Sequence, residues 1–423
     1  MKKWLFVSIL PLFLSASNLN ELIELSLKNE TYLTQELQSQ KAYEEKRAAF
    51  RAYLPSLSVQ GAYVANNKDR FIIDPKESLY AKLSLSVLLY DAGGREAKLK
   101  SLESLHKLAK LNQEYSKNYL FFQASTLFLN YQSVQALIKA SEQKELFLNE
   151  NLKRLEAFYK TGLSSKEELE SVRAKAALVK LELAKNKLQL LEISKNIQEL
   201  CGQNFIPQGN ASLKEPGYQS SNSLEIIIAQ EQSILAKHQL QSVRAEYFPR
   251  FFLQNNLGFY KNNFDIDIPN SPILPLQDFA NKYLQKHSTN NQFILGFEWK
   301  IFDFGATKAK VEAARLEVQM MSLNAAYTQR KNKLELNYLI DELKVLKEQI
   351  NALELSLNAS KLAFESVDKK YKAGLKSYTE YLQSLENLFQ TRANLELVKN
   401  EFEIAKARYY FNAGISIKER IAS

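Results

Sequence analysis

Alternation of apolar and polar side chains marks short stretches of the chain as β-strands. The two clearest stretches are residues 81–89 and 293–301, where apolar side chains occupy every second position. Each has a weaker alternating stretch upstream of it. Period-two patterning over about ten residues is typical of a strand with one face in lipid and the other in water. We therefore expect two membrane-spanning strand hairpins, with a soluble sheet packed on a helix as the alternative. The hairpins are expected at 55–90 and 249–302.

Elsewhere, apolar residues recur in steps of three and four, which predicts long helices. Gly and Pro, the residues least tolerated inside helices, number only 12 and 9 in the whole chain. The stretch from Gly94 to Tyr159 covers 66 residues. As an unbroken helix it would be about 100 Å long, wider than any globular core. Helices are expected at 18–52, 94–160, 165–200, 222–246, 306–371 and 377–411.

The longest helices carry a heptad seam typical of coiled coils. In the second half of the chain the seam residues are Leu343, Leu346, Ile350, Leu353, Leu357, Ser360, Phe364, Val367 and Tyr371. The same steps in the first half select Val134, Ile138, Ser141, Glu145, Leu148, Leu152, Leu155 and Tyr159. The fold class expected is mixed α and β, with long antiparallel coiled-coil helices and four strands per subunit.

The chain is a tandem repeat. Three glycines, Gly93, Gly162 and Gly202, recur 212 residues later as Gly305, Gly374 and Gly414. A constant offset across about 110 residues indicates two copies of one supersecondary unit. A Tyr-x-Pro landmark has an offset of 194 instead, so the second copy carries 18 extra residues in its hairpin loop, about 261–290. The expected parts are repeats at 18–202 and 222–414, an equatorial linker at 203–221 and a C-terminal tail at 415–423.

Residues 1–17 have the pattern of a secretory signal peptide: two lysines, a short apolar run and small residues at the cleavage site. The mature chain is expected to begin at Asn18. No later stretch approaches about 20 uninterrupted apolar residues, so no transmembrane helix is expected. Because no cysteine follows the cleavage site, an N-terminal lipid anchor is not expected either.

Composition argues against nucleic-acid binding and catalysis. The net charge is +9, but the lysines are interleaved with acidic residues along the expected helices, so nucleic acid is not an expected partner. The three histidines, His106, His238 and His287, are scattered, no Gly-rich phosphate loop is present, and Cys201 has no nearby histidine to activate it. We expect no enzymatic activity, cofactor or metal.

Four strands cannot close a membrane barrel, because the smallest common barrels have eight. Open sheet edges are not viable in lipid. The chain is therefore expected to oligomerise. Three copies would give twelve strands, and two helix pairs per copy would give a helical tube of approximate sixfold symmetry.

The order of several motifs carries a family resemblance. Arg-Ala and Tyr-x-Pro end a helix at 51–55 and 244–249, Asp-x-Gly follows each second strand, and Tyr-Lys-x-Gly-Leu joins each helix pair. With the tandem repeat, these motifs resemble the outer membrane efflux protein family, the TolC-like trimeric channels, over essentially the whole mature sequence. The resemblance implies a 12-strand barrel in the cell outer membrane, a long periplasmic α-barrel, and an equatorial collar made by Gln203–Ser221 and the C-terminal tail. It implies outer-membrane lipid, a periplasmic adaptor (membrane fusion) protein and an inner-membrane pump or ABC transporter as partners of the homotrimer.

The resemblance also points to the two helix turns. A glycine there supplies a left-handed backbone at no steric cost, which is the purely structural explanation. In the family, the turns form the pore entrance and the adaptor dock. Docking is therefore expected at Gly162, Leu163, Ser164, Gly374, Leu375 and Lys376.

In the family, an aromatic and a basic residue beside the second turn hold the entrance shut against groups beside the first. The matching gate positions here are Tyr371 and Lys376 on one side, Glu167 and Glu168 on the other, and Glu380 as a pore-facing acid. Gln383 stands where the family can have a second acid. A solvated helix face is the alternative for each charge. An exposed pair is worth only about 0–1 kcal/mol, so closure would need the threefold network.

These features favour a passive outer-membrane duct, a subunit of a tripartite efflux or type I secretion system. A free-standing diffusion porin is one alternative, disfavoured by about 100 Å of periplasmic coiled coil. A secreted or surface coiled-coil scaffold or adhesin is the other, disfavoured by the alternating strands. Drugs, metals and proteins all remain candidate cargoes, because the duct is wide and the pump selects.

Overall fold

The computed structural model of the protein describes residues 18–67, 75–217, 223–264, 282 and 284–422. The signal peptide expected at 1–17 and most of the long hairpin loop lie outside the described residues. The chain divides into two compact units. The helical unit comprises Met1–Leu37, Lys110–Ile228 and Ala326–Ser423, and the sheet unit comprises Gln38–Ala109 and Ala229–Ala325.

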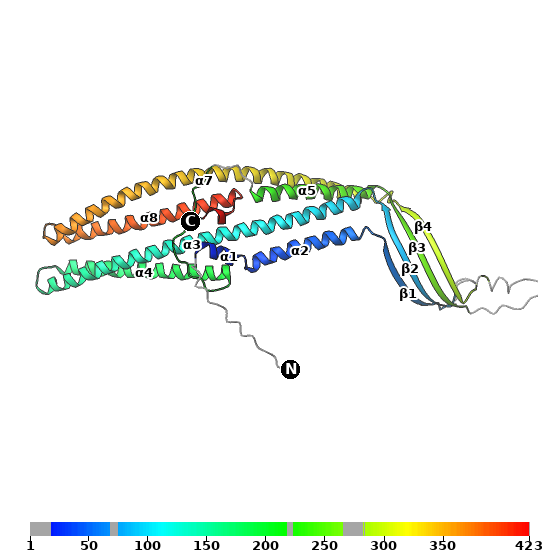
Figure 1. Cartoon of the computed structure of the whole chain (residues 1–423), viewed down its shortest axis with the longest axis horizontal. Coiled ribbons are helices and arrows are strands. Elements are labelled where there is room, and N and C mark those ends of the chain that lie inside the picture. The colour runs from blue at the N-terminus through cyan, green and yellow to red at the C-terminus, as the bar shows by residue number, and fades with distance from the viewer. Residues whose placement is uncertain (1–17, 68–74, 218–222, 265–281, 283, 423) are drawn as a thin grey trace, which may run out of the picture. The chain divides into compact units, whose positions relative to one another are not determined.

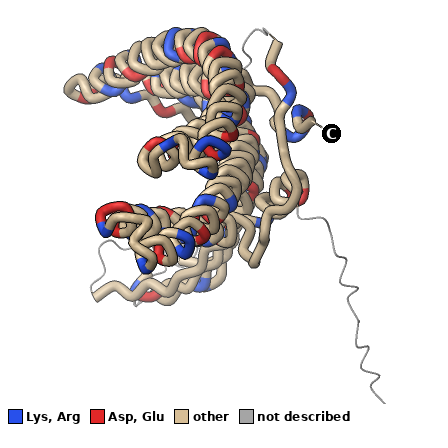
Figure 2. The backbone as a smooth tube through the Cα atoms, turned by 90° about the vertical axis from the view of Figure 1, so that its left-hand side faces the viewer, with Lys and Arg blue, Asp and Glu red and all other residues tan. Residues whose placement is uncertain are grey.

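Helices make up most of the described chain (Figure 1). The α-helices are α1 (Leu19–Ser26), α2 (Glu30–Arg51), α3 (Gly94–Lys160), α4 (Lys166–Cys201), α5 (Leu224–Arg244), α7 (Ala306–Lys372) and α8 (Tyr378–Asn412). Two short 3-10 helices are η1 (Ala245–Tyr247) and η2 (Ile417–Arg420). Within the helical unit, α4 returns antiparallel to α3 and α8 antiparallel to α7. Lys and Arg are interspersed with Asp and Glu along the helices (Figure 2).

The single helix expected at 18–52 is wrong: the structure has α1 and α2, separated by a turn. Asn29 accounts for the break. Its Oδ1 accepts the Thr31 N–H (2.9 Å) at the start of α2, while its Nδ2 donates to the Leu200 carbonyl (3.1 Å) at the end of α4. A side chain that caps one helix start and binds another helix end favours a break at that point.

The four strands form one antiparallel sheet in chain order, with β1 (Ser56–Ala65) and β4 (His287–Glu298) at its edges. β2 (Glu77–Tyr90) and β3 (Arg250–Asn263) pair in the middle and so join the two sequence repeats. The pairing of β1 with β2 ends at Ala65 and Glu77, and that of β3 with β4 ends at Lys261 and His287, so both hairpins turn at the same end of the sheet.

The last strand is shorter than its alternation suggests. The expected hairpin reached residue 302, but β4 ends at Glu298, and the Trp299 indole N–H donates to the Tyr247 carbonyl (3.0 Å). The following Asp-x-Gly starts α7: the Asp303 carboxylate accepts the N–H of Gly305 (3.1 Å) and of Thr307 (2.9 Å). The motif is thus a helix cap, which gives a physical reason for its place after each hairpin.

Register gives the two faces of the sheet different prevailing chemistry, because side chains alternate along a strand. The exceptions include Asn255 and Asn291 on the apolar face and Phe252 and Ile294 on the polar face. The apolar face carries aromatic and aliphatic residues on all four strands: Leu57, Val59, Leu83, Leu85, Leu253, Leu257, Phe293 and Leu295. The polar face carries hydroxyls and amides: Ser58, Gln60, Ser84, Ser86, Gln254, Asn256, Asn290 and Gln292. Near the helices, the Phe251 ring lies beside Tyr90 (6.1 Å) and Phe297 (6.0 Å), as in an aromatic girdle.

The helical unit has two buried clusters of apolar side chains. One surrounds α1, the middle of α3 and the end of α8, and the other lies near the helix turns. All nine seam positions expected on α7 are buried or half-buried. On α3, however, Tyr159 is 43% exposed, although its counterpart Tyr371 is half-buried, and Lys144, not Glu145, is the buried charge.

Candidate functional site

Each helix turn is closed by the same pair of backbone hydrogen bonds. Gly162 donates its N–H to the carbonyl three residues earlier (3.1 Å), and Leu163 donates to the carbonyl five residues earlier (2.8 Å). Gly374 and Leu375 repeat both bonds at 3.0 and 2.8 Å. This is the Schellman arrangement, which requires a left-handed residue at the glycine position; φ is +76° at Gly162 and +72° at Gly374.

A serine begins the next helix after each turn. Ser165 accepts the Glu168 N–H (3.1 Å), and Ser164 donates its hydroxyl to the Glu168 carboxylate (2.9 Å). At the second turn the cap is reciprocal: Ser377 accepts the Glu380 N–H (3.2 Å), and Glu380 accepts the Ser377 N–H (2.9 Å). Both turns are therefore rigid, capped tips rather than open loops.

Both tips present an apolar residue to solvent. Leu163 is 76% exposed and Leu375 is 75% exposed. In a Schellman turn the residue after glycine usually contacts an apolar side chain one turn back, but these two leucines extend outward. Exposed leucines at matched positions of two turns are suited to contact with another protein.

The gate residues beside the second turn are engaged locally. Lys376, which directly precedes the N-cap of α8, pairs with the Glu380 carboxylate in the first turn of that helix. The hydrogen bond from Lys376, followed by those from Ser377, lowers the pKa of Glu380 to about 2. Among the described residues, Lys376 forms no ion pair with Glu167 or Glu168; Glu167 lies exposed on α4.

Three tyrosines form a cluster that the sequence analysis identified only in part. The Tyr371 ring lies 4.9 Å from the Tyr381 ring and 5.6 Å from the Tyr378 ring. Burial raises the pKa of all three tyrosines, and the charge of Glu168 raises the pKa of Tyr371 and Tyr378 further. Glu168 therefore acts on Tyr371 through its charge, and no hydrogen bond joins the two among the described residues. The cluster also includes Tyr378 and Tyr381, which the sequence analysis did not single out. The signal for them was their spacing of three residues directly after the Ser377 cap.

Near the tips, α3 contacts α8. Lys144 on α3 pairs with Glu386 on α8 (2.7 Å), and its ammonium also lies 4.0 Å from Glu182 on α4. Asn151 donates to the Tyr381 hydroxyl (3.0 Å). These contacts join the helix pair of the first repeat to that of the second. Sequence alone gave no signal for Lys144, because its partners are more than 30 residues away.

The described part of the chain contains no group of three His, Cys, Asp or Glu side chains that could hold a metal ion. Among the described helices, none combines the length and the apolar character needed to cross a membrane.

The chain matches the model of one protein family, described as outer membrane efflux protein, over residues 22–203 and 220–414. No curated protein sequence matches it.

Solved channel structures share its fold. CmeC from Campylobacter jejuni is 18% identical with a TM-score of 0.81, covering 94% of this chain and 86% of CmeC. VceC from Vibrio cholerae is 16% identical with a TM-score of 0.80, covering 94% and 96%. The open state of MtrE from Neisseria gonorrhoeae is 15% identical with a TM-score of 0.80, covering 96% and 90%.

Proposed function

Because this chain belongs to the outer membrane efflux protein family, we propose that three copies form one duct, with a 12-strand barrel and a periplasmic helical tube. Family membership makes the chain an outer-membrane channel of an efflux system with a large periplasmic portion. The proposed duct catalyses no reaction. It conducts substrates that an inner-membrane pump or ABC transporter delivers through a periplasmic adaptor.

The observation that carries the proposal is the two-faced, open-edged sheet. Its apolar face suits lipid and its polar face suits water, while β1 and β4 each have one unpaired edge among the described strands. Unpaired backbone groups are costly in hydrocarbon, so the edges must pair with other copies. A soluble scaffold would have no use for an apolar face that stays exposed on all four strands.

We propose the two tips as the adaptor dock, with Leu163 and Leu375 as apolar anchors beside Gly162 and Gly374. A photo-crosslinking residue at Leu163 or Leu375 is expected to capture the adaptor from cells that carry both proteins. The control is Leu355, a 73% exposed leucine on α7. Equal capture at all three positions would contradict specific docking.

We propose that the gate combines the tyrosine cluster with Lys376. Tyr371 packs against Tyr378 and Tyr381, and the charge of Glu168 raises its pKa, while Glu380 pairs with Lys376 just before α8. Since Lys376 is satisfied within its own chain, closure depends on the six tips acting together rather than on one bridge to Glu167.

The gate is tested by the double variant Lys376→Glu with Tyr371→Phe. It places a second carboxylate beside Glu380 and removes one cluster hydroxyl, so the entrance is expected to open. Conductance in planar bilayers should rise several-fold, and cells should become sensitive to large antibiotics. Lys372→Glu is the control, because Lys372 forms a similar exposed pair with Asp368 (2.7 Å) before the turn. Unchanged conductance in the double variant would assign these residues to a solvated helix face.

A further inference from the structure

We propose that Lys82 places a ring of positive charge inside the barrel, so that the outer-membrane section of the duct favours anionic solutes. The inference rests on the trimeric barrel proposed above, in which three copies contribute one lysine each. It concerns the end of the duct that opens to the cell exterior, far along the chain from the tip residues. Lys82 would be a specificity-determining residue, and it belongs to none of the motifs shared by the two sequence repeats.

Register puts Lys82 on the polar face, near the middle of the sheet. It pairs directly with Gln60 on β1 and with Gly258 on β3. From Glu77 to Lys82 the strand advances about 17 Å, and from Lys82 to Tyr90 about 27 Å. The ammonium therefore belongs to the middle of the wall, not to either rim. In a membrane barrel the apolar face contacts lipid, so the polar face with Lys82 lines the lumen.

The polar groups around Lys82 are neutral and largely satisfied by one another. Asn256 Oδ1 accepts hydrogen bonds from Ser84 (2.8 Å) and from Gln254 (2.9 Å). Further out, Ser78 donates to the Asn262 side chain (2.8 Å). This part of the wall therefore supplies hydroxyls and amides, but no carboxylate that could neutralise the lysine.

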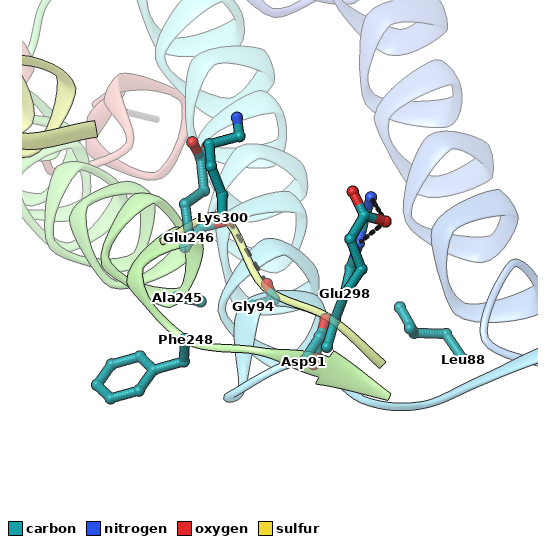
Figure 3. Close-up of a pocket in the computed structure, with 10 residues that line it drawn as sticks. Leu88, Asp91, Gly94, Ala245, Glu246, Phe248, Glu298 and Lys300 are labelled. Carbon is teal, nitrogen blue, oxygen red and sulfur yellow. Dashed lines mark hydrogen bonds and ion pairs between the residues drawn. The ribbon is translucent and has the colours of Figure 1, made fainter. Parts of the chain in front are cut away.

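The other charges of the sheet do not compensate Lys82. At the inner end of the polar face, Arg250 and Glu298 are cross-strand partners that neutralise each other (2.6 Å), as the dashed lines at Glu298 show (Figure 3). Glu77 lies in register with Ala65, on the apolar face, where it accepts from Asn263 (3.3 Å). Among the described residues, Lys82 has no ion-pair partner within 4.0 Å.

Three uncompensated lysines at one level of the barrel lumen would act together. Low-dielectric walls concentrate the field of like charges and raise the local concentration of counter-ions. A lumen of neutral hydrogen-bonding groups adds no opposing charge. Anionic solutes leaving the cell would be favoured at this level, and cationic solutes disfavoured.

The single cysteine of the chain makes the test clean, since Cys201 is buried and can be replaced by serine. Gln60→Cys puts a thiol directly opposite Lys82, within about 5 Å between Cβ atoms. In intact outer membranes, its modification rates with an anionic and a cationic methanethiosulfonate reagent report the local potential. Both reagents reach the thiol from the cell exterior, so the state of the periplasmic entrance does not matter.

Each rate is divided by the rate of the same reagent with a free thiol in solution. With Lys82 present, this normalised rate should be higher for the anionic reagent than for the cationic one. Lys82→Gln should lower the anionic-to-cationic rate ratio about five- to tenfold, for a potential on the order of one kT. Lys82→Glu should invert it. Lys261→Gln is the matched control. Lys261 lies on the apolar face of β3, two residues after Phe259, which pairs with Ala81, so its replacement should leave the rate ratio unchanged.

Two results would overturn the inference. One is a ratio that stays the same in Lys82→Gln while Gln60→Cys is labelled. The other is labelling of Val59→Cys but not of Gln60→Cys, which would put Lys82 towards lipid. Failure of the trimeric barrel itself is distinguished separately, by the absence of β1–β4 cross-links between copies.

Discussion

Glu380 closes the N-terminus of α8 with a charge that is held at an unusually low pKa. Its folded pKa of about 2 lies below the ordinary 4.5, so its stabilising contribution is complete above pH 4.5. That contribution is lost as the pH falls from 4.5 towards 2. We expect the first turn of α8 to fray in this window, because the protonated carboxyl no longer binds Lys376 and the Ser377 N–H.

Hydrogen–deuterium exchange of peptides covering residues 375–384, corrected for intrinsic rates, measures the fraying. Protection should fall between pH 4.5 and 2.5 in the wild type. In Glu380→Gln it should already be reduced at pH 7 and should vary less with pH. Peptides from the first turn of α4 serve as the internal control. A wild-type profile that is flat across the window would contradict the capping role.

Lys406 is a buried charge whose partners fix the equatorial segment. Its ammonium pairs with Glu403 (2.6 Å) and donates to the Leu213 carbonyl, while Glu403 accepts the Leu213 N–H (2.7 Å). Only 4% of the Lys406 side chain is exposed. Removing one partner of a buried pair leaves the other uncompensated, at a cost of about 3–5 kcal/mol.

Lys406→Met is therefore expected to lower the thermal midpoint of helical circular dichroism by several degrees and to expose residues 211–217 to protease. Lys399→Met is the control, because the Lys399–Glu354 pair (2.8 Å) is about half exposed at both ends. Such a pair contributes about 0–1 kcal/mol. If both variants have the same thermal midpoint, the contacts of Lys406 with Glu403 and Leu213 contribute no more stability than an exposed ion pair.

At the level of single residues, short sequence motifs predicted the two helix turns but not the long-range contacts of Lys406 and Lys144. The Gly162 and Gly374 turns follow from backbone sterics, and these depend on nearby residues alone. Lys406 has one partner nearby in the sequence, Glu403, but its contact with Leu213 and that of Lys144 with Glu386 join residues far apart, so no short window of the chain contains both ends of either contact.

At the level of elements, helix lengths were predictable because Gly and Pro are absent from the long stretches. Boundaries set by tertiary contacts were not. The break between α1 and α2 depends on Asn29 reaching Leu200, and the end of β4 coincides with Trp299 reaching Tyr247. The seam failed only at Tyr159, which is exposed, whereas its counterpart Tyr371 packs against Tyr378 and Tyr381.

The contact between α3 and α8 is expected to restrain the entrance. Lys144 on α3 connects the two helix pairs, since its ammonium pairs with Glu386 on α8 and lies near Glu182 on α4. Lys144→Gln keeps hydrogen bonding but removes the charge, so the two helix pairs should separate more easily. Cells carrying it should become moderately more sensitive to large antibiotics, without loss of protein from the outer membrane.

Lys187→Gln is the matched control for Lys144. Lys187 forms a longer pair with Glu142 (3.8 Å), exposed at both ends, within the first helix pair. It should leave antibiotic sensitivity unchanged. Wild-type behaviour of Lys144→Gln in both cells and planar bilayers would mean that the α3–α8 contact stabilises the fold without restraining the entrance.

At the level of the whole molecule, four strands with two free edges predict that β1 of one copy pairs with β4 of the next. Cysteines at Val59 and at successive positions of β4, in a chain with Cys201→Ser, are expected to form disulfides between copies. On denaturing gels these should give covalent dimers and trimers of a chain whose full-length mass is 48.6 kDa. The cross-linking should peak at one β4 register, because pairing sets a fixed partner for each residue.

The control for this cross-link is the pair Ala81→Cys and Phe259→Cys, which are direct partners on β2 and β3 of the same chain. It should oxidise readily yet leave the chain monomeric on the gel. The contrast separates pairing within a copy from pairing between copies under identical oxidation. If β1–β4 cysteines oxidise nowhere while Ala81 and Phe259 do, the sheet edges are not joined. A stable monomer that retains β-structure in detergent would then exclude the 12-strand barrel, since four strands cannot close one alone.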